Sequence, residues 1–122
     1  MQTNRRLFIL SLLMLPVTAQ AGDSRNYIGN GMASYYGSEF SGNHTASGER
    51  FDPNGLTAAH RSLPFGSRVA VTNLTNGRDV VVRVNDRGPN SKSRIIDISY
   101  AAAKEIGMDR TGTANVRLQL LD

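Results

Sequence analysis

The chain has 122 residues, with 14 Lys and Arg against 10 Asp and Glu, a formal net charge of +4, and no cysteine. The charges are dispersed, whereas a phosphate-binding surface needs clustered cations, so the composition argues against nucleic acid as a partner. The absence of cysteine excludes a disulfide framework and a lipid-modified cysteine. A chain of this length has room for one domain with one hydrophobic core.

The first 21 residues predict a secretory signal peptide. Arg5 and Arg6 form a positive n-region, residues 7–17 an apolar h-region, and residues 19–21 a cleavage site of small residues. The apolar run is too short to cross a bilayer comfortably, so we expect cleavage after Ala21 and no stable membrane anchor. The mature chain would then be periplasmic or secreted, with 12 basic against 10 acidic residues.

After the signal peptide we expect a lead-in, a strand and a long loop. Residues 22–30 are polar and contain glycine, which predicts a flexible lead-in, and residues 32–36 alternate as a first strand. Residues 37–55 are rich in Gly, Ser, Asn, Asp, Pro and Thr, with Phe40 and Phe51 as their large apolar side chains. A loop this long in a small domain is more often functional than incidental.

The rest of the chain predicts short strands and one helix. The hairpin turn is expected at Asn76-Gly77, and Ser99 and Gly107 suit the two ends of a helix over residues 100–106. Alternating apolar residues predict the strands at 56–60, 68–74, 80–84, 94–98 and 115–121. Six short strands and one helix favour an all-β fold closed into a small barrel, because closure removes exposed strand edges.

The segment from Val80 to Pro89 combines a buried strand with a polar end and a fixed turn. Val80 to Val84 is mostly β-branched, Asn85, Asp86 and Arg87 follow, and Gly88-Pro89 ends the strand. A carboxylate held at such a junction has a defined position, so Asp86 is the candidate catalytic acid. Alternatively, Asp86 accepts hydrogen bonds from the backbone N–H groups of the turn.

Six short motifs in one order resemble the RlpA-like family (rare lipoprotein A), bacterial lytic transglycosylases built on a double-psi β-barrel. The similarity covers residues 31–121, so residues 31–122 are expected to form one catalytic domain. The motifs are Gly31-Met-Ala-Ser-Tyr-Tyr-Gly37, Thr45-Ala-Ser-Gly-Glu49, Leu56-Thr-Ala-Ala-His60, Val71-Thr-Asn73, Asn85-Asp-Arg-Gly-Pro89 and Arg94-Ile-Ile-Asp-Ile-Ser99.

This resemblance implies an enzyme that cuts peptidoglycan glycan strands between N-acetylmuramic acid and N-acetylglucosamine and leaves a 1,6-anhydro end. It also implies that Asp86 is the catalytic acid and that Glu49 and His60 belong to the active site. No cofactor is expected. The expected substrate-binding residues are Tyr36, Thr45, Ser47, Asn85 and Arg87.

Each of these side chains also has a plainer interpretation. Glu49 could be an exposed loop residue, and His60 a loop residue or a partner of the backbone. If Asp86 donates a proton, we expect Glu49 to be a neighbouring carboxylate and Arg87 to point away, towards backbone or the region of Asp97. His44 either contacts substrate or has no functional role.

Other functions are weighed against transglycosylation. Metal catalysis is not expected, because the two histidines lack i, i+4 spacing and there is no C-x-x-C pair. A non-catalytic wall-polysaccharide module of expansin type and an inverting glycoside hydrolase are the alternatives. Tyr35, Tyr36, Phe40 and Phe51 are candidates for stacking on sugar rings or for the core.

Overall fold

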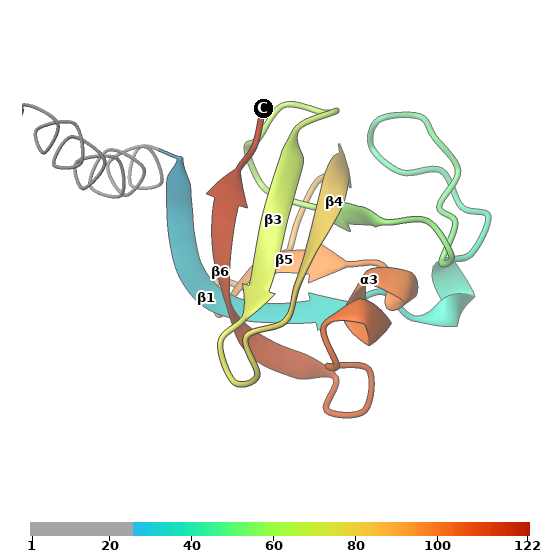
Figure 1. Ribbon diagram of the computed structural model, residues 1–122. Helices are drawn as coiled ribbons and strands as arrows, with labels where there is room; N and C mark the ends of the chain where they lie inside the picture. The colour runs from blue at the N-terminus through green and yellow to red at the C-terminus, as the bar shows by residue number, and fades with distance from the viewer. Residues whose placement is uncertain (1–25) are drawn as a thin grey trace, which may run out of the picture.

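The strands of the protein close into a barrel in the order β1-β5-β2-β4-β3-β6 (Figure 1). The computed structural model describes residues 26–122, and the predicted signal peptide lies outside them. The elements are β1 (Tyr27–Tyr35), β2 (Thr57–Ala59), β3 (Arg68–Asn73), β4 (Asp79–Asp86), β5 (Arg94–Ile98), α3 (Tyr100–Glu105) and β6 (Thr113–Leu120).

The barrel mixes parallel and antiparallel pairs, so its strand order differs from its sequence order. β5 is parallel to β1 and antiparallel to β2, and β2 is parallel to β4. β6 pairs antiparallel with both β1 and β3 and thereby closes the sheet. This arrangement confirms the expected all-β barrel of six strands with one short helix.

Period-two alternation fills the barrel, as the sequence predicts. Val69 and Val71 of β3 and Val116 and Leu118 of β6 are fully buried, because alternate residues of a strand point to one face. The core also holds buried residues of the other strands and of the helix: Ala33, Ala58, Val82, Val84, Ile96, Ile98, Ala102, Ala103, Ile106 and Met108.

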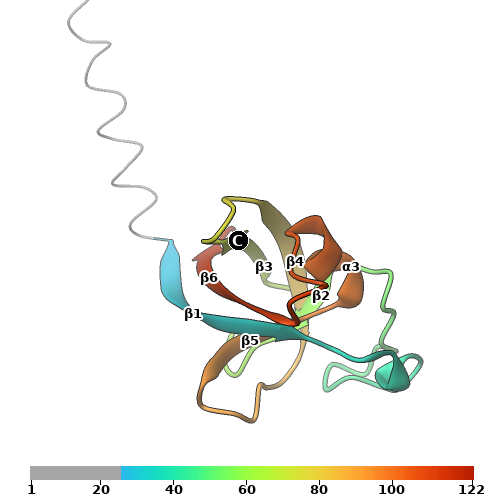
Figure 2. The ribbon, with the colours of Figure 1, turned by 90° about the horizontal axis from the view of Figure 1, so that it is seen from below.

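The helix α3 begins where the sequence predicts and ends at Glu105, one residue before the predicted end. The Ser99 hydroxyl accepts a hydrogen bond from the backbone N–H of Ala102 (3.2 Å), which caps the first turn. Gly107 follows the last turn with φ of 73°, a conformation that favours glycine. The helix and the loop of residues 37–55 lie on the side of the barrel where β1 ends (Figures 1 and 2).

Two segments differ from the sequence prediction. β1 begins at Tyr27, so residues 27–30 belong to a strand rather than to a flexible lead-in, because they pair with the end of β6. The loop of residues 37–55 contains a short 3-10 turn, Ser38–Phe40, and a β-bridge between His44 and Arg50. Within residues 26–122, no helix is long and apolar enough to span a membrane.

Candidate functional site

A bulge in β4 turns the side chain of Asp86 to the outer face of the barrel. Ala58 of β2 lies opposite Val84, but the next residue, Ala59, lies opposite Asp86, so Asn85 is an extra residue in β4. Bulges redirect the side chains that follow them and are common beside functional sites. Val84 is therefore fully buried in the core, whereas Asp86 is partly exposed on the outer face.

Three adjacent strands place Asp86, Ala59 and Asp97 in one row. Ala59 lies opposite Asp86 of β4 on one side and opposite Asp97 of β5 on the other, and Asp97 pairs with Ser34 of β1. Since neighbouring strands are about 4.8 Å apart, the backbones of the two acids are separated by roughly 9–10 Å. The side chain of Ala59, between them, is a single methyl group, so it leaves space between the two acids.

A groove of about 660 Å³ runs over this row. Asp86 and Asp97 both line it, together with Tyr36, His44 and Arg94. One wall is the turn of residues 87–90, and the other is formed by the end of β1 and the loop that follows it. A concavity of this volume is typical of a ligand-binding site.

Three donors hold the carboxylate of Asp86. Its Oδ1 accepts hydrogen bonds from the backbone N–H groups of Ala46 and Arg87, each 2.9 Å, and its Oδ2 accepts one from the Tyr36 hydroxyl at 2.7 Å. The turn hydrogen bond anticipated from the sequence is therefore present, through Arg87, but it occupies one oxygen. Because each carboxylate oxygen has two acceptor sites, Oδ2 keeps one for a ligand in the groove.

Tyr36 holds the carboxylate of Asp86 from the wall of the groove. Its ring stacks on Phe51, with centroids 4.6 Å apart, and this packing fixes the direction of its hydroxyl. Burial, and then the hydrogen bond to Asp86, raise the pKa of Tyr36 far above its ordinary value, and the charge of Asp97 adds to the effect. Tyr36 therefore remains a protonated donor at physiological pH.

Asp97 is anchored on one side and open on the other. Its Oδ1 accepts hydrogen bonds from the Ser34 hydroxyl (2.6 Å) and from Arg94 Nε (3.0 Å). Among residues 26–122, no side chain or backbone group donates a hydrogen bond to Oδ2. Asp97 thus brings a fixed negative charge into the groove, opposite Asp86.

The structure does not place Glu49 in the groove. Its carboxylate receives a bidentate pair from Arg83, at 2.6 and 3.0 Å, and a third hydrogen bond from Asn85 Nδ2 at 3.2 Å. The Arg83 hydrogen bonds, and then that of Asn85, lower the pKa of Glu49, so this acid stays ionised near neutral pH. Asp97, and not Glu49, lines the groove together with Asp86.

Glu49 lies on a turn that contacts Asp86 through its backbone. Within this turn the N–H of Thr45 donates to the carbonyl of Glu49 (2.7 Å), and the Thr45 and Ser47 hydroxyls lie 3.0 Å apart. The N–H of Ser47 donates to the carbonyl of Asn85 (3.2 Å), while Ala46 reaches Asp86. Thr45, Ser47 and Asn85, expected as substrate contacts, therefore build the support of Asp86 and do not line the groove.

His60 also supports the backbone. Its ring Nδ1 accepts hydrogen bonds from the backbone N–H groups of Ser62 and Leu63, each 3.2 Å. The backbone N–H of His60 donates to the backbone carbonyl of Asp86. Burial, and then the charges of Arg61 and Arg87, lower the pKa of His60, which keeps the ring neutral and able to accept. His60 does not line the groove.

Arg87 points away from the carboxyl group of Asp86, as predicted. Its Nη1 donates to the backbone carbonyl of His60 (3.2 Å), and its guanidinium lies 4.0 Å from the centre of the Phe65 ring. Arg94, and not Arg87, binds Asp97. Within residues 26–122, no three His, Asp or Glu side chains gather in a way that would hold a metal ion.

The sequence motifs do not single out Asp97 as a residue of the groove. Its signal is a carboxylate between the buried Ile96 and Ile98, because alternation then places residue 97 on the outer face. The strand order that sets this face beside β4 is a long-range property, and no local pattern encodes it.

Comparison with known proteins gives this chain relatives along most of its length. A family model described as "Lytic transglycolase" matches residues 28–118. A probable endolytic peptidoglycan transglycosylase RlpA of Synechocystis is 54% identical over 104 residues, which are 85% of this chain and 32% of that protein. The endolytic peptidoglycan transglycosylase RlpA of Pseudomonas aeruginosa is 54% identical over 100 residues, 82% of this chain and 29% of that protein. The chain thus spans about a third of the length of these curated relatives.

Solved structures with the same barrel are more distant in sequence. The Streptomyces papain inhibitor has a TM-score of 0.63 and 23% identity, covering 77% of this chain and 94% of the inhibitor. An expansin of Clavibacter michiganensis has a TM-score of 0.60 and 18% identity, covering 76% of this chain and 50% of the expansin. These likenesses concern the fold, and with the family match they confirm the RlpA-like double-psi β-barrel.

Proposed function

We propose, because this chain belongs to the lytic transglycolase family, that it cleaves the glycan strands of peptidoglycan as an endolytic transglycosylase. The observation that carries the proposal is the carboxylate of Asp86, fixed by three donors in an open groove with one acceptor site of Oδ2 left free. A substrate of this kind lies outside the cytoplasm, so we expect the protein to be exported to it, and the predicted signal peptide supports this expectation.

In the proposed reaction Asp86 is first an acid and then a base. Protonated at Oδ2, Asp86 gives its proton to the glycosidic oxygen between N-acetylmuramic acid and N-acetylglucosamine. The bond between this oxygen and the anomeric carbon of the muramic acid unit then breaks. The ionised Asp86 then takes the proton of the C6 hydroxyl of the muramic acid unit, whose oxygen bonds to the anomeric carbon. The product is a 1,6-anhydro ring, and no water is consumed.

Neighbouring side chains serve this cycle in different ways. The Tyr36 hydroxyl stabilises Asp86 while it is ionised, since a hydrogen bond to a charged group is stronger than one to a neutral group. The negative charge of Asp97 favours the oxocarbenium-like centre that forms as the bond breaks. Glu49 acts as a positioning residue, because it holds the turn that donates to Asp86.

Product analysis with an Asp86→Asn variant tests the proposal. The wild-type protein, incubated with intact and with peptide-free sacculi, is expected to release fragments with 1,6-anhydro ends, detected by mass spectrometry. Asp86→Asn should reduce their release by at least about a hundredfold, because proton transfer by a positioned side chain contributes 10²–10⁴-fold. Asp79→Asn, which changes an exposed acid at the other end of β4, is the matched control and should retain full activity.

Two results would refute this assignment. Release unchanged in Asp86→Asn would remove the acid from its role. Binding to sacculi without soluble products, equally strong in Asp86→Asn, would identify a polysaccharide-binding module.

One observation favours inverting hydrolysis as the second candidate. Asp86 and Asp97 face one groove from strands whose backbones are roughly 9–10 Å apart, so two carboxyl groups flank the groove, as the general acid and the general base of an inverting glycosidase do. An inverting hydrolase adds water to its product, so reducing ends that incorporate ¹⁸O from labelled water would favour hydrolysis. Anhydro ends without the label would favour transglycosylation.

A further inference from the structure

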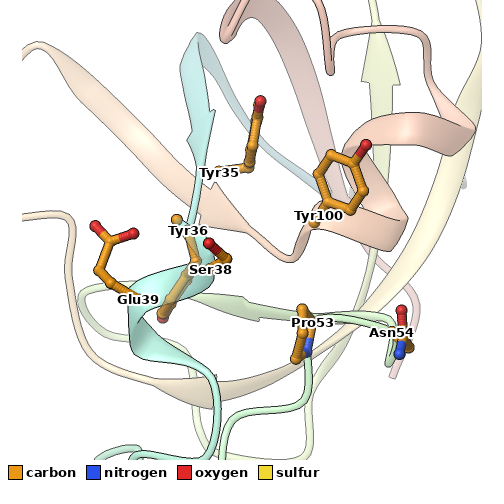
Figure 3. A pocket seen from close by; sticks show the side chains of 8 residues that line it. Tyr35, Tyr36, Ser38, Glu39, Pro53, Asn54 and Tyr100 are labelled. Carbon is orange, nitrogen blue, oxygen red and sulfur yellow. The ribbon is translucent and has the colours of Figure 1, made fainter.

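A second cavity, of about 550 Å³, adjoins the groove of Asp86 (Figure 3). The two concavities share Tyr35, Tyr36, Gly37 and Glu39, so they meet at the end of β1. In Figure 3, Tyr100 from the start of α3 faces this cavity across from the 3-10 turn that carries Glu39. A chain ligand in the groove can therefore continue into the cavity along the surface.

The aromatic walls of this cavity are held in place. The Tyr35 hydroxyl donates to the carbonyl of Asp109 (2.8 Å), and the rings of Tyr35 and Tyr100 are 5.7 Å apart in a tilted arrangement. The backbone N–H of Ala101 donates to the carbonyl of Pro53 (3.0 Å), which fastens the loop at Pro53 to the helix. The cavity is preformed, so a ligand would meet little conformational cost on binding.

Tyr100 is an exposed ring with no role in the core. It is 40% exposed, and the Nζ of Lys104 lies 5.6 Å from its centroid, outside the cavity. Tyr35, Tyr36, Tyr100 and Pro53 make the walls largely apolar, and Glu39 and Asn54 add polar atoms. Flat apolar walls beside a few hydrogen-bonding groups suit a sugar ring, which has C–H faces and polar edges.

The charge of the lining selects among the sugars of a peptidoglycan strand. Among the described residues, Glu39 is the one acidic side chain that lines the cavity, and no Lys or Arg lines it. The muramic acid unit carries a lactyl carboxylate or a peptide with acidic groups, which the exposed carboxylate of Glu39 repels weakly through solvent. N-acetylglucosamine is uncharged, and its amide N–H can donate a hydrogen bond to a carboxylate.

We propose that this cavity is a subsite for an N-acetylglucosamine unit of the same strand that is cut at Asp86. The proposal rests on the proposed function, since the strand in the groove supplies the unit. Through this subsite, the protein holds the strand on one side of the scissile bond, so it binds longer oligosaccharides more tightly than fragments too short to reach the cavity.

Tyr100→Ala tests the subsite, with Tyr27→Ala as the matched control. Tyr27 is a 50% exposed tyrosine near the start of β1, and it lines neither concavity. Peptide-free glycan oligosaccharides of two to eight sugars are titrated by calorimetry into proteins that also carry Asp86→Asn, so that cleavage does not interfere. Tyr100→Ala should weaken binding of the longer oligosaccharides roughly two- to tenfold, the equivalent of losing one aromatic contact, and leave the disaccharide unchanged.

A second variant tests the charge of the subsite. Glu39→Gln keeps the size of the side chain and removes its charge, so it should strengthen binding of oligosaccharides whose muramic acid unit is forced into the cavity. Equal affinities of the Tyr100→Ala and Tyr27→Ala proteins at every length would overturn the subsite. If Tyr100→Ala weakens binding of the longer oligosaccharides but the wild-type protein cleaves no glycan, the subsite stands and the proposed function is refuted. The two failures are therefore distinguishable.

Discussion

Tyr36 is the side chain on which the geometry of the candidate acid depends. Its hydroxyl is the one side-chain donor among residues 26–122 to the carboxylate of Asp86, and stacking on Phe51 holds the ring independently of that hydrogen bond. Removing the hydroxyl therefore changes the site without changing the packing.

Tyr36→Phe should lower kcat roughly 10- to 100-fold, since a hydrogen bond to a charged group contributes about 1.5–3 kcal/mol. The midpoint of thermal unfolding should stay near that of the wild type, because the ring and its neighbours remain. Release of anhydro-ended fragments and circular dichroism measure the two effects. Tyr27→Phe, which removes the hydroxyl that contacts Asn30, serves as control. An unchanged kcat in Tyr36→Phe would show that this hydroxyl does not stabilise the ionised acid.

At the scale of single residues, the sequence predicts the fixed position of Asp86 but not the place of Asp97 across the groove. Asp86 follows a β-branched strand and precedes Gly88-Pro89, a local pattern that implies a fixed position. Glu49 is in a recognisable motif, yet its carboxylate binds Arg83 and Asn85, and the sequence alone gives no indication of that pairing. Asp97 reaches the groove through strand order, which depends on contacts far apart in the chain.

The turn of residues 45–49 is the element that joins a surface ion pair to the candidate acid. The Glu49–Arg83 pair is more than 40% exposed on both sides, so it contributes little to stability. Its consequence is local, because the same turn carries the N–H of Ala46 that donates to Asp86. Glu49 can therefore matter for activity without taking part in proton transfer.

Glu49→Gln and Arg83→Met should both lower kcat, by similar factors of roughly 3 to 30, because each loosens the turn, and a single hydrogen bond contributes about 0.5–2 kcal/mol. The double variant should be no worse than either single variant, since both remove one interaction. The cross-strand neighbour Arg68 forms a comparable exposed ion pair with Asp122, so Arg68→Met is the matched control with wild-type kcat. Full activity of Arg83→Met combined with inactivity of Glu49→Gln would instead give Glu49 a chemical role.

The elements themselves are largely predictable from the sequence, and the exception at residues 27–30 has a physical cause. Strand alternation, the turn at Asn76-Gly77 and the cap at Ser99 are local signals, and each one is found in the structure. Residues 27–30 look like a flexible lead-in because their composition is polar, but pairing with β6 makes them a strand. Tertiary pairing overrides local preference there, as it commonly does for β-strands.

At the scale of the whole molecule, the groove is built on strands of the same closed barrel that contains the core. The groove residues come from β4, β2, β5 and β1, and β6 closes the barrel by pairing with both β1 and β3. A domain of this size with a single core usually unfolds in one cooperative step. Weakening the closure strand β6 should therefore lower the stability of the groove as well.

Leu118→Ala in β6 should lower the free energy of unfolding by about 2–5 kcal/mol, because Leu118 is fully buried and its loss leaves a cavity. The neighbouring Leu121 is 45% exposed, so Leu121→Ala is the matched control and should cost much less. Urea unfolding followed by far-ultraviolet circular dichroism and by tyrosine fluorescence, which includes Tyr36 in the groove, should give coincident transitions in both variants. If the tyrosine signal of Leu118→Ala were lost at lower urea than the sheet signal, the groove would be a separate folding unit, and a continuous barrel would not explain how Asp86 is held.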